Sequence, residues 1–119
     1  MIVDEKTKKY QYEIEHDYGN HSWLCGHVTC KYDDLVKALG EPHYTYIDGK
    51  IDAEWSFKVS SKDEAVDGVI FTLYNWKNGD AYLKDGTPIS SITEWNIGGT
   101  GYHAVMACLE VLTERNVIC

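Results

Sequence analysis

The segment Tyr74-Asn75-Trp76-Lys77 carries side chains whose types and order suit ligand binding. Trp76 can stack on a nucleobase, Asn75 can hydrogen-bond to a base edge, and Lys77 can neutralise a phosphate. The segment therefore favours non-covalent binding of a nucleotide-like ligand. A strand end with a buried indole and a capped loop would contain the same residue types, so a purely structural role is the alternative.

The choice of aromatic residues points in the same direction. The chain has nine Tyr and four Trp but only two Phe. Tyr and Trp combine an apolar face with a polar edge, and they accumulate at interfaces and binding sites. Half-buried positions in a sheet are the alternative for any single one of them.

Three cysteines and histidines near the first third of the chain invite two chemical interpretations. Cys25, His27 and Cys30, with His21 nearby, could hold zinc, and a Cys–His pair could act as a nucleophile. The spacing lacks paired C-x-x-C motifs, and nothing identifies a group that orients the base or an oxyanion hole. We expect ordinary strand residues, no metal and no cofactor.

Two carboxylates and one glycine-rich segment are the remaining candidates for catalysis or anion binding. Asp52 and Glu54 lie two residues apart on a predicted strand, so their side chains share a face at roughly 7 Å, as an acid and base pair would. Solvated charges on the outer face of the strand are the better prediction. The segment 98–101 lacks the Walker lysine, although a helix that begins there could meet an anion. We expect no enzymatic activity.

The composition limits the possible partners and compartment. A chain of 119 residues predicts a single domain, 1–119, and its net charge of -8 argues against polynucleotide binding. The charged first nine residues predict no signal peptide, and no apolar run approaches a membrane span. Without a secretory signal, we expect the four cysteines to be reduced and the protein to be cytoplasmic.

Alternating and helical patterns predict the elements that must position these side chains. Strands are expected at 9–16 and 23–28, joined as a hairpin, and at 51–59, 69–76 and 92–97, with 69–76 central and a loop over 78–91. Helical spacing predicts a helix from Tyr32 to Leu39, ended by Gly40.

A second helix follows Thr100, the predicted N-cap. Its predicted sheet-facing stripe is Tyr102, Val105, Met106, Leu109 and Leu112. The order predicts an α+β fold, with a single antiparallel sheet of about five strands and two helices on one face. The other face, rich in Tyr and Trp, would be open to a partner or ligand.

Four ordered motifs carry a resemblance to a known family. They cover 32–42, 48–55, 73–79 and 93–99, including Asp48-Gly49-Lys50 and the segment around Trp76. This set resembles a widespread group of small phage-encoded proteins, and through it the phage anti-defence sponge proteins. Those proteins sequester cyclic dinucleotide signals of the host CBASS system.

The resemblance implies capture of a cyclic dinucleotide, such as cyclic GMP–AMP, without hydrolysis. It implies a homodimer or higher homo-oligomer with a shared site in the cytoplasm of the host cell. Trp76 would stack, Asn75 would read a base edge and Lys77 would hold a phosphate. Tyr10, Tyr12 and Tyr18 would form aromatic walls. The alternative function is an acidic protein that mimics nucleic acid and inhibits a host defence protein.

Overall fold

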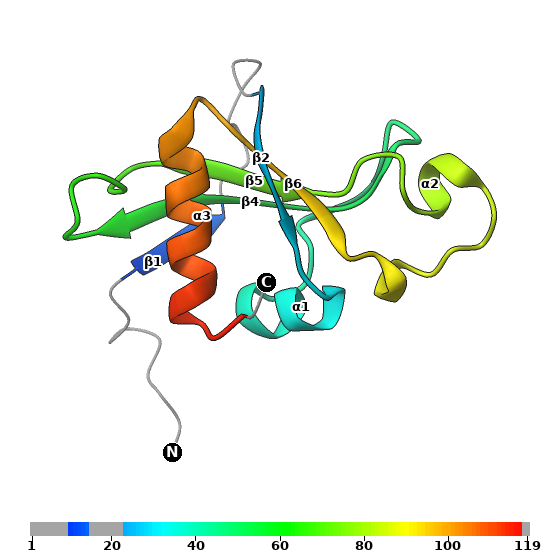
Figure 1. Ribbon diagram of the computed structural model, residues 1–119, viewed down its shortest axis with the longest axis horizontal. Coiled ribbons are helices and arrows are strands. Elements are labelled where there is room, and N and C mark those ends of the chain that lie inside the picture. The colour runs from blue at the N-terminus through cyan, green and yellow to red at the C-terminus, as the bar shows by residue number, and fades with distance from the viewer. Residues whose placement is uncertain (1–9, 15–22, 118–119) are drawn as a thin grey trace.

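One antiparallel sheet forms the body of the molecule. The computed structural model describes residues 10–14 and 23–117. The strand order is β1 (Tyr10–Ile14), β4 (Ile51–Ser61), β5 (Ile70–Tyr74), β6 (Glu94–Gly99) and β2 (Trp23–Thr29), and the short β3 (Tyr44–Ile47) also pairs with β4 (Figure 1). The predicted α+β fold is confirmed, as is the central position of the strand predicted at 69–76.

The first two strands do not form the predicted hairpin. β1 pairs with β4 at one side of the sheet, whereas β2 pairs with β6 at the opposite edge. Alternation determines which residues of a strand share a face, but it does not identify the partner strand. The prediction of two strands was therefore confirmed, and their pairing was wrong.

The first helix, α1 (Tyr32–Leu39), begins and ends where the sequence predicted. Gly40 follows it with a φ of 85°, a left-handed conformation that suits glycine, and its N–H donates to the carbonyl of Val36 at 2.8 Å. Leu35 and Leu39 are buried against the sheet. The helix therefore covers one end of this sheet face.

Two buried indoles form hydrogen bonds to the backbone, one just before α1 and one just after it. Trp95 Nε1 donates to the carbonyl of Cys30, before the helix, at 3.0 Å, and Trp55 Nε1 donates to the carbonyl of Gly40, after it, at 2.9 Å. The two rings meet edge to face with centroids 5.5 Å apart. Each indole N–H is thus satisfied inside the core, as burial of a donor requires.

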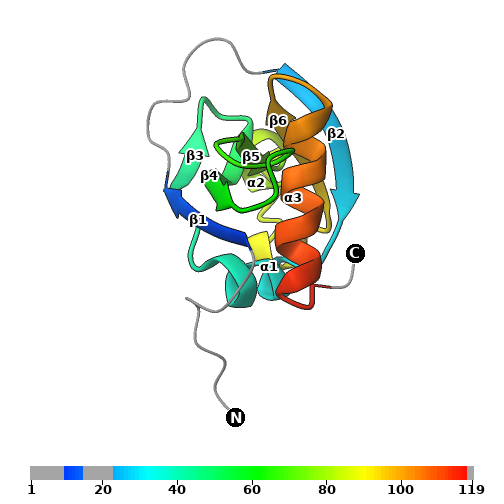
Figure 2. The same ribbon diagram turned by 90° about the vertical axis from the view of Figure 1, so that its left-hand side faces the viewer.

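The long helix, α3 (Tyr102–Glu114), lies on the same face of the sheet (Figures 1 and 2). Its N-cap is Gly101, and no side chain caps it, so the predicted N-cap Thr100 was wrong. The buried side of the helix consists of Ala104, Ala107, Cys108, Val111 and Leu112.

The predicted sheet-facing stripe of α3 was confirmed for Leu112, and in part for Val105 and Met106, which are partly buried and pack against the core. It was wrong for Tyr102 and Leu109. Tyr102 is 72% exposed and Leu109 41% exposed. A Cβ on Gly99 would collide with Cβ of Ala104, so the helix sits directly on the strand. Only small side chains fit at this distance, and they displace the larger apolar residues to the outer side.

The second face of the sheet is polar and buried at its centre, against the prediction of an open face. Ser56 and Thr72 lie opposite each other on β4 and β5, and both are buried. The predicted loop 78–91 contains two short elements, α2 (Asp80–Leu83) and the 3-10 helix η3 (Ile89–Ser91). These lie at the end of the molecule where β4 begins (Figure 1).

One cysteine departs from the prediction of reduced thiols. Cys30 is disulfide-bonded, whereas Cys25 and Cys108 are free. Within residues 10–14 and 23–117, no helix has the length and apolar character needed to cross a membrane.

Candidate functional site

An aromatic and basic cluster forms where β5 ends and α2 begins. Trp76 is 45% exposed, and the ammonium groups of Lys50 and Lys77 each lie 5.6 Å from its ring centroid. Lys77 also lies 5.1 Å from the ring centroid of Tyr82, another exposed residue. We call Trp76, Lys50, Lys77 and Tyr82 the Trp76 cluster. It places two cations beside an accessible indole, within the range of cation–π attraction.

A backbone hydrogen bond holds this cluster in position, and two residues in or near it have unusual backbone conformations. The N–H of Lys77 donates to the carbonyl of Lys50 at 2.9 Å, so the β3–β4 turn is joined to the end of β5. Lys77 has a φ of 60° and Tyr46, in the facing hairpin, a φ of 53°. Left-handed conformations are unfavourable for such bulky residues and concentrate at functional sites.

Asn75 has a different position from its neighbour Trp76. It is fully buried, and its Oδ1 accepts from the N–H groups of Asp52 at 2.7 Å and Ala53 at 3.1 Å. Its Nδ2 donates to Oδ1 of Asp52 at 2.8 Å and to Oδ1 of Asn78 at 2.9 Å. An amide has two donors and two acceptor sites, so none remains for a ligand. Asn75 supports the cluster from the protein interior, and the base-reading role predicted for it does not fit this geometry.

Asp52 completes this buried support. Its second oxygen, Oδ2, accepts from the N–H of Ala81 at 3.1 Å, which attaches the start of α2 to β4. Gly79 is needed at this point because a Cβ there would collide with the Asp52 carboxylate. Asp52 and Glu54 were predicted as solvated outer charges, but both are buried. The sequence missed this support because a buried acid and an exposed one occupy the same place in an alternating pattern.

A line of polar side chains crosses the second face of the sheet. Strand register places the following residues opposite one another in turn: Tyr44, Glu54, Tyr74, Asn96 and His27. We call these five residues the polar row. His27 Nδ1 lies 2.9 Å from Oδ1 of Asn96, and because an amide oxygen can only accept, the imidazole donates this hydrogen bond.

Tyr74 joins the polar row to the Trp76 cluster. Its ring meets that of Trp76 edge to face, with centroids 6.5 Å apart. Burial raises the pKa of the Tyr74 phenol above its ordinary value of 10.0; hydrogen bonding to the Asn96 side chain lowers it in part, and the negative charge of Glu54 raises it further. The phenol therefore stays neutral near pH 7 and keeps a proton that it can donate. Asn96, which is partly exposed, offers the amide that Asn75 cannot.

The predicted aromatic walls lie largely outside the described part of the structure. Tyr10 and Tyr12 belong to β1, whose backbone pairs with β4, but their side chains are outside the described residues, as is all of Tyr18. Of the sequence-predicted site residues, Trp76 and Lys77 come together. Tyr74 belongs to the same segment, whereas Lys50, Tyr82 and Asn96 join it through the fold.

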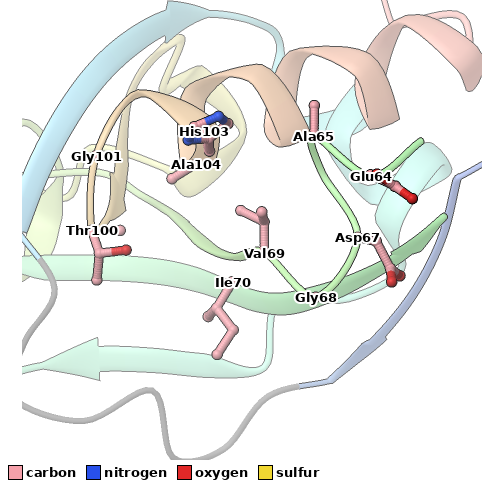
Figure 3. Close-up of a pocket in the computed structure, with 11 residues that line it drawn as sticks. Glu64, Ala65, Asp67, Gly68, Val69, Ile70, Thr100, Gly101, His103 and Ala104 are labelled. Atoms are coloured by element: carbon pink, nitrogen blue, oxygen red, sulfur yellow. The ribbon is translucent and has the colours of Figure 1, made fainter. Parts of the chain in front are cut away.

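A cavity of about 480 Å³ lies at the other end of β4 and β5 (Figure 3). The start of α3, with Thr100 and Gly101, forms one wall, and the segment that carries Glu64 and Asp67 forms the other. Its size suits a small ligand. However, two carboxylates and no Lys or Arg line it, which disfavours a phosphate, so the anion site considered for this helix start receives no support.

The described residues offer little for metal or nucleophilic chemistry. Among residues 10–14 and 23–117, no group of three or more His, Cys, Asp and Glu side chains is placed to hold a metal ion. The Cys25 thiol donates to the carbonyl of Trp23 at 3.3 Å, and burial raises the pKa of the Cys108 thiol far above its ordinary value. Cys108 is thus held as an inert thiol.

No protein-family model matches the chain, and no curated protein matches it.

Proposed function

We propose that this protein captures a small nucleotide ligand, specifically a cyclic dinucleotide such as cyclic GMP–AMP, and holds it without hydrolysis. The observation that supports this proposal is the exposed Trp76 with the ammonium groups of Lys50 and Lys77 each 5.6 Å from its ring. An indole face stacks on any base, and adjacent cations neutralise phosphates, so the Trp76 cluster suits both parts of a nucleotide.

Recognition of the base would extend from the Trp76 cluster into the polar row. A base stacked on Trp76 directs its edge toward neighbouring polar groups, and Tyr74, in ring contact with Trp76, supplies a neutral phenol. Asn96, hydrogen-bonded to the Tyr74 side chain, supplies an amide with both donor and acceptor character. In this proposal Asn75 supports the site and Asn96 contacts the ligand.

The proposed outcome of binding is sequestration. Stacking and charge pairing withhold the ligand from its receptor while every covalent bond stays intact. This is the activity implied by the resemblance to phage sponge proteins, and it would operate in the cytoplasm of the host cell. The structure supports it only through the binding chemistry of the Trp76 cluster.

Calorimetric titration with a panel of cyclic dinucleotides and linear nucleotides tests this proposal. We expect binding of at least one cyclic dinucleotide, with Trp76→Leu weakening it about 5- to 150-fold, as loss of roughly 1–3 kcal/mol of stacking requires. Lys77→Ala should also weaken binding. Trp23→Leu, which removes the exposed indole of β2, is the matched control and should leave affinity unchanged. The ligand recovered after heat denaturation should be intact.

Absence of binding by every nucleotide, or equal affinity of the wild type and Trp76→Leu, would exclude the proposal. The net charge of -8 favours a second candidate, an acidic inhibitor that mimics nucleic acid. Such an inhibitor would bind a basic host protein with an affinity that falls steeply with salt. It would lose activity when surface carboxylates, rather than Trp76, are replaced.

A further inference from the structure

The ammonium group of Lys77 lies against two exposed aromatic rings. It is 5.6 Å from the ring centroid of Trp76 and 5.1 Å from that of Tyr82. Both aromatic residues are close to half exposed, at 45% and 48%. Two aromatic rings around one ammonium form a small cation site, because each ring face attracts positive charge. In this structure the chain's own lysine fills that site.

The fold positions both sides of this cation site. Lys77 has a φ of 60°, and its N–H donates to the carbonyl of Lys50 at 2.9 Å, so the backbone that carries the ammonium is held in place. Tyr82 lies on α2, where the preceding residue, Ala81, donates its N–H to the buried Asp52 carboxylate at 3.1 Å. The approach of Tyr82 to Lys77 therefore follows from the attachment of α2 to β4.

The two lysines of the Trp76 cluster face rings and not carboxylates. Among the residues that the structure describes, neither Lys50 nor Lys77 makes an ion pair. This is notable in a chain with 19 Asp and Glu but only 11 Lys and Arg. A phosphate that reached Lys77 would replace weak cation–π contacts with a charge-assisted hydrogen bond, and it would not have to break an ion pair first.

The Lys77 ammonium also occupies space that a stacked base needs. A flat ring in contact with groups on both of its faces needs about 3.5 Å on each side, or roughly 7 Å in total. The ammonium is only 5.6 Å from the centre of the Trp76 ring, so no base fits between them. A base can stack on this side of the indole only after the ammonium has moved away.

We infer that Lys77 is the specificity-determining residue of the Trp76 cluster, because it covers the indole against uncharged bases and uncovers it for ligands that carry a phosphate. The identity of the ligand rests on the proposed function. Displacement of the ammonium from the two rings opposes the stacking of every base. Only a phosphate compensates for it, since the displaced ammonium then pairs with the phosphate. The cluster therefore selects nucleotides over nucleosides.

Titration with guanosine, guanosine monophosphate and cyclic GMP–AMP tests the inference. Lys77→Ala should bind guanosine about 2- to 5-fold more tightly than the wild type, because no cation–π contact has to be broken. It should bind both phosphate-bearing ligands about twofold or more weakly, because their ion-pair partner is lost. Lys84→Ala is the matched control, since Lys84 is exposed just after α2 and has a similar φ of 56°. It should leave all three affinities close to those of the wild type.

A second measurement needs no ligand. The ring currents of Trp76 and Tyr82 should shift the ε-methylene protons of Lys77 upfield in the proton–carbon NMR spectrum, and Tyr82→Leu should reverse part of this shift. Lys84 should show no such shift. An unshifted Lys77 would overturn the inference. Guanosine affinity that is equal in wild type and Lys77→Ala, or that changes in the same direction as the affinity for guanosine monophosphate, would also overturn it.

These outcomes are distinguishable from failure of the proposed function. If the wild type prefers guanosine monophosphate to guanosine and Lys77→Ala loses this preference, the inference holds even when no cyclic dinucleotide binds, and only the proposed function is excluded. If cyclic GMP–AMP binds while Lys77→Ala leaves the preference between guanosine and its monophosphate unchanged, only the inference is excluded.

Discussion

Asn75 and Trp76 are adjacent in sequence but have opposite environments. The strand alternation sends the Asn75 side chain into the interior, where its amide is used completely, and leaves the Trp76 ring partly in water. The sequence motif predicts the two residues as one binding set, yet it cannot distinguish a side chain that is open to solvent from one that holds the loop beneath it. That distinction depends on Asp52, which is more than twenty residues away in the chain.

Replacing Asn75 should therefore act mainly on the stability of the fold and only indirectly on binding. Asn75→Ala removes the partner of two buried backbone N–H groups and one of the hydrogen bonds to the buried Asp52 carboxylate, so we expect a loss of about 2 kcal/mol or more in the free energy of unfolding. Urea denaturation measures this loss. Asn96→Ala, at a partly exposed position, is the control and should cost less. Equal stability of wild type and Asn75→Ala would contradict the supporting role.

Tyr74 gives the stability of the protein a dependence on alkaline pH. Its folded-state pKa is raised above 10.0, so folding favours the neutral phenol. The resulting stabilisation is fully present below about pH 10 and is lost as the pH rises through the folded-state pKa. We expect the free energy of unfolding to fall less steeply above pH 10 in Tyr74→Phe than in the wild type. Urea denaturation at about pH 9 and about pH 11 measures the difference, and identical slopes would contradict it.

At the scale of elements, local sequence patterns predicted the bounds of an element better than its partners in the fold. The bounds of α1 and the cap at Gly40 follow from spacing and backbone chemistry that lie within a few residues of each other. The partner of β1 and the orientation of α3 depend instead on distant residues. For α3, the side with larger apolar residues was the natural prediction for the core. The glycine at position 99 reverses that choice by bringing the helix too close for them.

This close approach of α3 to β6 can be tested as a pair of substitutions. Gly99→Ala should destabilise the fold by about 1–3 kcal/mol, because its new methyl group collides with Ala104. Ala104→Gly alone removes a helix-favouring residue and should cost about 1 kcal/mol. The double variant should recover part of the loss, which a double-mutant cycle measures by denaturation. Simple additivity would show that the two positions do not meet.

At the scale of the whole molecule, the two faces of the sheet have separate characters. One face is closed by α1 and α3 and contains the apolar core. The second face presents the polar row, which runs from the β3 hairpin to His27 on the edge strand. The cavity near Glu64 lies at a third location and has walls of acidic character. The two faces and the cavity thus offer three chemically different surfaces.

The distribution of the four tryptophans provides separate optical signals for folding and ligand capture. Trp55 and Trp95 are buried with centroids 5.5 Å apart, so their coupled transitions should dominate the near-ultraviolet circular dichroism and report the folded core. Trp76 and Trp23 are exposed, and acrylamide should quench their emission first. Under the proposed function, protection of Trp76 from the quencher would accompany nucleotide binding, whereas Trp23 should stay accessible to it. Emission from single-tryptophan variants would therefore follow folding and ligand capture independently, without an added label.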